Sequence, residues 1–135
     1  MELAKVNAAA VAAYQEAGLD LPTAYEGFPF TPPDATPWAR LFWLPVRTDS
    51  RLQTADKYTG ILQIDLNFPL GLGTRAAHDG AQALLDHFRP YRTFAYDTVI
   101  LSVRSREPSS IRNEGGWQTV TVSVTFATAM DRAFP

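Results

Sequence analysis

Residues 60–68 read Gly60-Ile61-Leu62-Gln63-Ile64-Asp65-Leu66-Asn67-Phe68, and this stretch decides the fold class. Its side chains alternate: those at 62, 64, 66 and 68 are apolar, whereas those at 63, 65 and 67 are polar. Successive side chains of a β-strand point to opposite faces of a sheet, so the two sets separate onto different faces. The stretch therefore predicts a strand that is buried on one face only.

Three further segments have strand character. Residues 38–46 are apolar and aromatic (Trp38, Leu41, Phe42, Trp43, Leu44), which predicts a strand buried on much of both faces. Residues 98–104 carry Val99, Leu101 and Val103 at alternate positions, and residues 118–127 alternate Val120, Val122, Val124 and Phe126 with threonine and serine. Polar loops of mixed charge, 47–59 and 105–116, separate the members of each pair, so we expect two antiparallel strand pairs.

Two segments have helical periodicity. Residues 2–17 repeat apolar side chains at helical spacing up to Gly18, and residues 74–88 do so between Thr74, a suitable N-cap, and Pro90. The expected class is α+β: an antiparallel or mixed sheet of about four main strands, with helices packed mainly on one face, in the order α-β-β-α-β-β. We expect one domain over 1–135, with an N-terminal helix (1–18), an extended arm (24–37), the sheet with the second helix (38–127) and a C-terminal tail (128–135).

The arm has the most unusual composition in the chain. It reads Tyr25-Glu26-Gly27-Phe28-Pro29-Phe30-Thr31-Pro32-Pro33 and runs on to Pro37-Trp38. Its four prolines fix φ and remove backbone donors, so the segment is neither a helix nor a central strand. A stiff arm with three aromatic side chains either packs over its own sheet or is offered to a neighbouring subunit. No catalytic pattern of similar sharpness occurs elsewhere, and this contrast favours an assembly role.

Composition narrows the function classes. The net charge is −2, whereas general binders of nucleic acid or anionic membranes carry a basic excess. Cysteine is absent, which excludes a disulfide framework, thiolate metal sites and a cysteine nucleophile. The Ala-rich N-terminal segment is interrupted by charged and polar residues, so we expect neither a signal peptide nor a membrane span and place synthesis in a cytoplasm.

The candidate chemical motifs are weak. Gly71-Leu72-Gly73-Thr74-Arg75-Ala76 imitates a dinucleotide-binding turn, but the strand–helix–strand crossovers that such a site needs are missing, so a plain turn with glycines at positive φ is expected. His78 and His87 are nine residues apart on one helix. They therefore lie on opposite faces and cannot share a metal, and a solvated or capping role is expected for both. We predict no cofactor and no metal.

The arm and the segments after it match a known order of structural residues. Phe28-Pro29-Phe30-Thr31-Pro32-Pro33 is followed by Pro37-Trp38-Ala39-Arg40, Leu44-Pro45, Gly60, Phe68-Pro69, Gly71-Leu72-Gly73 and an Ala-rich helix. From about Tyr25 to Phe126, this order and spacing resembles the tail terminator (minor tail) proteins of long-tailed bacteriophages, a family that also occurs in prophages.

The resemblance implies a structural protein, not an enzyme. It implies a ring, expected to be a hexamer, that caps the tail tube protein, ends tube polymerisation and offers a surface to the head–tail connector proteins. DNA would pass through the lumen without specific binding, and the protein would act in the host bacterial cytoplasm during assembly and in the virion tail, without a membrane. We expect subunit or tube contacts at Phe28, Phe30, Arg47, Arg51, Lys57, Arg106, Arg112 and Glu114.

Three alternatives stay open at this point. One is a different head–tail connector or tail-completion protein, which differs from a terminator because only loss of the terminator gives overlong tails. A second is a small enzyme that uses Asp65 or Asp97 with a histidine, which predicts a concave pocket with a perturbed group. A third is a monomeric module that binds a small molecule or peptide through its proline-rich arm.

Overall fold

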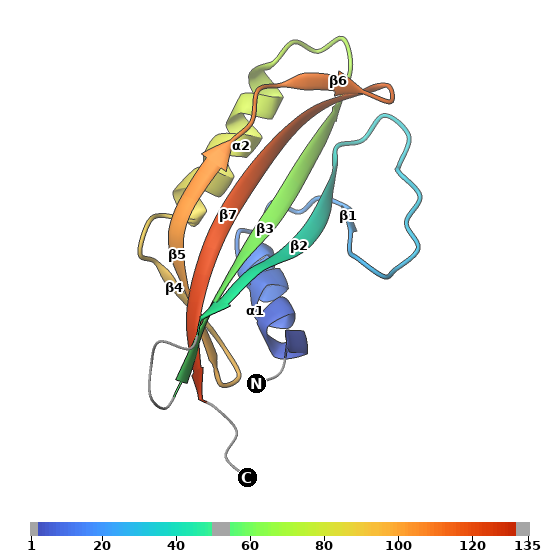
Figure 1. The fold of residues 1–135 in the computed structure, drawn as a ribbon. Coiled ribbons are helices and arrows are strands. Elements are labelled where there is room, and N and C mark those ends of the chain that lie inside the picture. Colours follow the sequence, from blue (N-terminus) through green and yellow to red (C-terminus); the bar gives the residue numbers. More distant parts are fainter. Residues whose placement is uncertain (1–2, 50–54, 132–135) are drawn as a thin grey trace.

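A computed structural model describes residues 3–49 and 55–131, and within them two helices and one seven-stranded sheet (Figure 1). The helices are α1 (Leu3–Gln15) and α2 (Arg75–His87). The strands are β1 (Thr23–Ala24), β2 (Trp38–Asp49), β3 (Ala55–Pro69), β4 (Thr93–Tyr96), β5 (Val99–Pro108), β6 (Arg112–Glu114) and β7 (Trp117–Asp131). Their order in the sheet is β1-β2-β3-β7-β5-β4, and β6 pairs with β7 beside this path.

This architecture corrects the expected class. The described chain is mostly β, with seven strands in one curled, mixed sheet, and the order α-β-β-α-β-β with about four strands was wrong. The missed strands β1, β4 and β6 are short, and each is defined by its partner: β1 pairs parallel with β2, β4 pairs with β5, and β6 pairs with β7. Segments of two to four residues show too little periodicity to be recognised without that partner.

The long strands also extend into the segments predicted as polar loops. β3 pairs with β7 along its whole length, from Ala55 opposite Asp131 to Pro69 opposite Trp117. β2 continues to Asp49, and β5 continues to Pro108. Ladder hydrogen bonds join backbone groups, so a strand continues through polar residues wherever its neighbour continues. The loops of 47–59 and 105–116 are therefore shorter than expected.

The core lies between one face of the sheet and the two helices. Leu62, Ile64 and Leu66 of β3 are fully buried and lie opposite buried valines of β7. α1 contributes Val6, Ala9, Ala10 and Ala13 to this core, and α2 contributes Ala77, Ala81 and Leu84. Small side chains on α1 allow the helix to lie close to the sheet. The alternation in residues 60–68 was thus predicted correctly, and its polar side chains lie on the opposite face.

The arm is the connection between the parallel strands β1 and β2. Residues 25–37 join the end of β1 to the start of β2 (Figure 1, pale blue). Parallel neighbours need a long crossover, because the chain must return to the starting end before the second strand begins. The proline-rich segment provides this return without a helix. It is therefore held to the sheet at both ends.

Candidate interface sites

A tight turn at the start of the arm presents Phe28 to solvent. Gly27 has a φ of +81°, and the Phe28 N–H donates to the Tyr25 carbonyl at 3.2 Å. Glycine at the third position with positive φ is typical of a type II turn. The Phe28 side chain is 73% exposed, although it is a large apolar group. A conformation fixed by the backbone thus holds an aromatic ring outward.

The outer edge of β2 is capped beside this turn. The Trp43 N–H donates to Glu26 Oε1, so a carboxylate of the arm takes the place of a neighbouring strand's carbonyl. Two residues on, Pro45 has no N–H to offer, and the register with β3 shifts between Pro45 and Arg47. Prolines and bulges at sheet edges oppose strand addition. Partners at this edge are therefore expected to bind through side chains.

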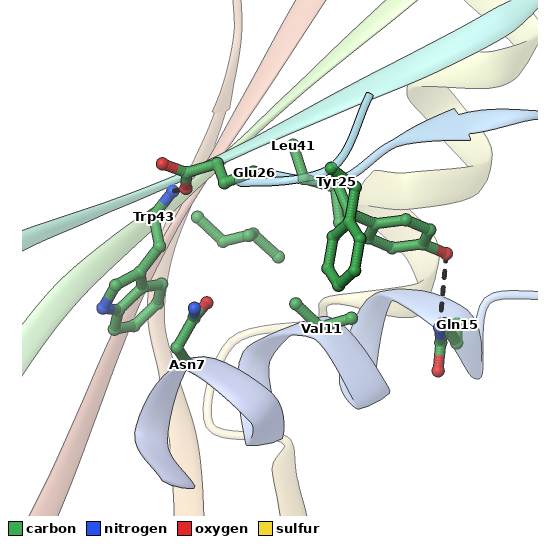
Figure 2. Close-up of a pocket in the computed structure, with 9 residues that line it drawn as sticks. Asn7, Val11, Gln15, Tyr25, Glu26, Leu41 and Trp43 are labelled. Atoms are coloured by element: carbon green, nitrogen blue, oxygen red, sulfur yellow. Dashed lines mark hydrogen bonds between the residues drawn. The ribbon is translucent and has the colours of Figure 1, made fainter. Parts of the chain in front are cut away.

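A pocket of about 290 Å³ lies between the arm, α1 and the sheet (Figure 2). Its lining comes from α1 (Asn7, Val11, Gln15), the arm (Tyr25, Glu26, Phe28) and the strands (Leu41, Trp43, Leu62). Gln15 Nε2 donates to the Tyr25 hydroxyl at 3.2 Å, which ties the arm to α1. We call this the arm pocket. It combines apolar side chains with polar groups from Asn7, Gln15 and Glu26, and its volume is at the lower limit of small-molecule sites.

Trp43, on β2, lines one end of the arm pocket (Figure 2), and its indole lies over Gly60 of β3, which is the register partner of Pro45. A Cβ placed on Gly60 would lie 2.2 Å from Cζ2 of the Trp43 indole and 2.6 Å from its Cη2. The indole also stacks on Tyr58, with ring centroids 6.4 Å apart. Gly60 therefore allows the indole to lie flat against the sheet.

A polar network covers part of the sheet face that carries Asp65 and Asn67, which we call the polar face. The Thr121 hydroxyl donates to Asp65 Oδ1 at 2.6 Å and accepts from Arg112 Nη2 at 2.9 Å. Arg112 also forms an ion pair with Glu114. Beside them the Thr119 hydroxyl donates to Asn67 Oδ1 at 2.7 Å, and both side chains are buried. The charged and polar groups of this network have partners within the chain, so the network stabilises this face of the sheet and leaves none of these charges unpaired.

The remaining predicted contact residues lie in different environments. Phe30 is half-buried against Trp38, with ring centroids 5.3 Å apart. Arg106 donates through Nε to the Leu85 carbonyl at 2.8 Å, which joins β5 to α2. Arg47 and Lys57 belong to the paired ends of β2 and β3, and Arg51 lies outside the described residues. Among these side chains, Phe28 is the one that the described structure leaves most clearly free for a partner.

The weaker motifs are also placed. Gly71 and Gly73 have φ values of +89° and +75°, so the expected turn is confirmed. His78 is exposed, whereas His87 differs from expectation: its Nε2 lies 2.7 Å from the Ala13 carbonyl and links α2 to α1. Within residues 3–49 and 55–131, no helix is long and apolar enough to cross a membrane.

Sequence reasoning missed one exposed feature, Tyr91, which follows Pro90 in the connection from α2 to β4. Its φ is +66°, and its N–H donates to the Val103 carbonyl at 2.8 Å. The side chain is 75% exposed. A bulky residue at positive φ is uncommon and costs free energy. In the sequence, Tyr91 is only an aromatic residue after the proline that ends the helix, and this pattern indicates a helix terminus and nothing more.

Comparison with known proteins identifies the family. No curated protein matches the chain. Several solved structures match the chain, and one of them superimposes on it with a TM-score of 0.76 and 25% sequence identity, covering 100% of this chain and 99% of the other. The sequence pattern of the phage tail terminator proteins matches residues 5–126, which include most of α1, all of α2, the arm and most of the sheet. These proteins are structural components of the phage tail, in keeping with the interpretation as a non-enzyme. The chain belongs to the phage tail terminator protein family.

Proposed function

We propose that this protein ends the growth of the phage tail tube and provides the surface to which the head is joined. The observation that carries the proposal is the family match over residues 5–126. The exposed aromatic ring of Phe28 supports it, because aromatic side chains are enriched at protein interfaces. The acting partners are the tail tube protein on one side and the head–tail connector proteins on the other.

The assembly proposed is a ring, expected to contain six copies. The two outer edges of the sheet, β1 with β2 at one end and β4 with β5 at the other, differ in sequence and structure. Contacts between unlike surfaces are head-to-tail, and they close into rings when the rotation allows it. DNA passes through the centre without specific binding, which fits a net charge of −2. Phage or prophage genomes are the proposed source, and host cytoplasm the place of assembly.

The deciding experiment is deletion of the gene from the phage or prophage that carries it, followed by negative-stain electron microscopy of the lysate. We expect tails longer than those of the parent and without heads, and normal tails after complementation. Headless tails of normal length would instead assign a head-joining role. Normal particles would refute both roles.

Contact residues are tested by complementation of the same deletion. Phe28→Ser should fold, because the ring is exposed, and should give overlong tails if it lies at a tube or subunit contact. Shortening the connection between Asp49 and Ala55, which contains Arg51, leaves the paired residues of β2 and β3 in place and tests that connection separately. Leu72→Ser is the matched control for Phe28→Ser, because Leu72 is 74% exposed against 73% for Phe28. Normal tail length with Phe28→Ser and with the shortened connection would remove Phe28 and Arg51 from the proposed contacts.

A further inference from the structure

The two outer edges of the sheet differ in charge. We call the first the arm edge, which comprises the arm, the end of α1 and the outer side of β2. From Val6 to Ala39 the chain has no lysine or arginine, but it has four exposed acidic residues: Glu16, Asp20, Glu26 and Asp34. The first basic residue after them, Arg40 of β2, is half-buried beside the arm, with its guanidinium over the Trp38 ring. Asp20 lines a shallow pocket together with Gln15 and Tyr25, so this charge lies beside the arm pocket.

The opposite edge is basic. We call it the Arg edge; it comprises the connection from α2 to β4, β4 itself and the outer part of β5. Residues 88–106 contain four arginines and a single acidic residue, Asp97, which pairs with Lys5, and the exposed Glu107 follows on β5. Arg92 and Arg106 donate to the carbonyls of His87 and Leu85 at the end of α2. Arg89 and Arg104 are exposed and have no ion-pair partner among the described residues.

Tyr91 lies on the Arg edge, two residues after Arg89 in the sequence. Three backbone hydrogen bonds hold this connection: Tyr91 N–H to Val103, Arg92 N–H to Arg89 and Val103 N–H to Arg92, at 2.8, 3.1 and 2.9 Å. Because the Tyr91 side chain is exposed, it gains no packing within the chain that would offset the backbone strain. Strained backbone positions cluster at functional sites, and Tyr91 is the bulkiest of the four non-glycine residues at positive φ in the described structure. Tyrosine is also enriched among the residues that dominate binding energy.

The arm pocket matches the chemistry of a tyrosine side chain. Val11, Leu41 and Leu62 offer apolar contact to a ring, and Asn7, Gln15 and Glu26 offer polar groups to a hydroxyl. The volume of about 290 Å³ suits an inserted side chain better than a drug-sized ligand. In Figure 1 the connection from α2 to β4 lies on the left and the arm on the right, and β4 and β1 are the two outer strands of the sheet.

We propose that the Arg edge of one copy binds the arm edge of the next, with Tyr91 inserted into the arm pocket and Arg89 and Arg104 facing the acidic residues. The occupant of the pocket is thus a second copy of this chain, and charge complementarity between the edges carries that choice. The inference rests on the proposed function, because a head-to-tail contact leaves one edge of each kind free and propagates until a ring closes.

A cross-linking experiment tests the contact directly. The chain has no cysteine, so introduced thiols are the only ones present. Asn7→Cys places a thiol at the arm pocket, Tyr91→Cys places one on the Arg edge, and Leu72→Cys is the control, since Leu72 is 74% exposed against 75% for Tyr91. Single variants are mixed in pairs at high protein concentration, and also on purified tails, and treated with a short bismaleimide.

The expected product is a covalent dimer from Tyr91→Cys with Asn7→Cys, and none above background from Leu72→Cys with Asn7→Cys. The chain carrying both Tyr91→Cys and Asn7→Cys should give a ladder of oligomers. Equal yields with the control, or no product in free protein and on tails, overturn the proposal. Tail length after gene deletion is scored independently. Overlong tails without the cross-link reject this contact alone, and the cross-link with normal tails rejects the terminator role alone.

Two further variants separate binding from folding. Tyr91→Gly relieves the positive φ, so its melting temperature should equal or exceed that of the parent while self-association, measured by sedimentation, weakens about tenfold or more. Reversal of the Arg edge (Arg89→Glu with Arg104→Glu) should weaken association, and added reversal of the arm edge (Glu16→Lys with Asp20→Lys) should restore it. Self-association that is unchanged by Tyr91→Gly would contradict the proposed pairing. So would a combined reversal of both edges that fails to restore the association lost when the Arg edge alone is reversed.

Discussion

Replacing Gly60 by alanine should destabilise the protein through one contact, that between the new methyl group and the Trp43 indole. The added Cβ would lie 2.2 Å from Cζ2, and a rigid indole stacked on Tyr58 must move as a unit to relieve this. Overpacking of this kind costs about 1–3 kcal/mol. Alanine also lowers the conformational entropy of the unfolded chain relative to glycine, which offsets about 0.4–1 kcal/mol of this cost. The expected net loss is about 1–2 kcal/mol, or roughly 4–8 °C in melting temperature.

The assay is a double-mutant cycle followed by urea and thermal unfolding. In a Trp43→Ala background the methyl group meets no indole, so Gly60→Ala should become stabilising by about 0.4–1 kcal/mol. Gly80→Ala is the matched control. Its Cβ would meet only side-chain atoms, Phe68 Cζ at 3.0 Å and Leu66 Cδ1 at 3.1 Å, and alanine is favoured in a helix, so it should stay near the parent. Gly60→Ala at parental stability with Trp43 present would refute the reasoning.

Three other predictions concern single groups. Thr119→Val removes the donor to buried Asn67 and should cost about 1–3 kcal/mol in urea unfolding; a loss near zero would mean that Asn67 finds another donor. Burial raises the pKa of Tyr14 above its ordinary value of 10.0. The folded state then keeps a proton that the unfolded chain loses, so the free energy of unfolding should be unaffected well below pH 10 and fall as the pH rises past it. In Tyr14→Phe the free energy of unfolding should therefore fall less between about pH 8 and 11 than in the parent. An equal fall in the two proteins would contradict this. Glu26→Ala should speed amide exchange at Trp43, while Glu26→Gln keeps an acceptor and should not; equal rates in both would exclude the cap.

Local periodicity predicted those elements whose environment is uniform along their length. The alternation in residues 60–68 identified the middle of β3, and the helical periodicity of residues 74–88 identified α2, whose Ala77, Ala81 and Leu84 are buried. Both signals come from side chains facing a single core. Periodicity could not show that β3 begins at Ala55, because pairing with β7, which is far away in sequence, sets that boundary.

The candidate site was less predictable because it belongs to no single segment. The arm was recognised as an unusual segment, but its pocket also needs α1 and two strands, and its side chains come from positions between Asn7 and Leu62. The charged residues Arg106 and Arg112 looked free in sequence. Their partners, the Leu85 carbonyl and the Thr121 hydroxyl, become neighbours only through the sheet register. Tyr91 is conspicuous only once its φ is known.

The arm is a loop whose two ends are fixed in neighbouring strands, and this has a consequence for how the surface can change over evolution. Closing a longer loop between the same two points costs little, about 0.6 kcal/mol for each doubling of its length. Residues 25–37 can therefore gain or lose residues without altering the pairing of β1 with β2. Selection for a different neighbour can act on the length and sequence of this segment while the sheet that supports it stays the same.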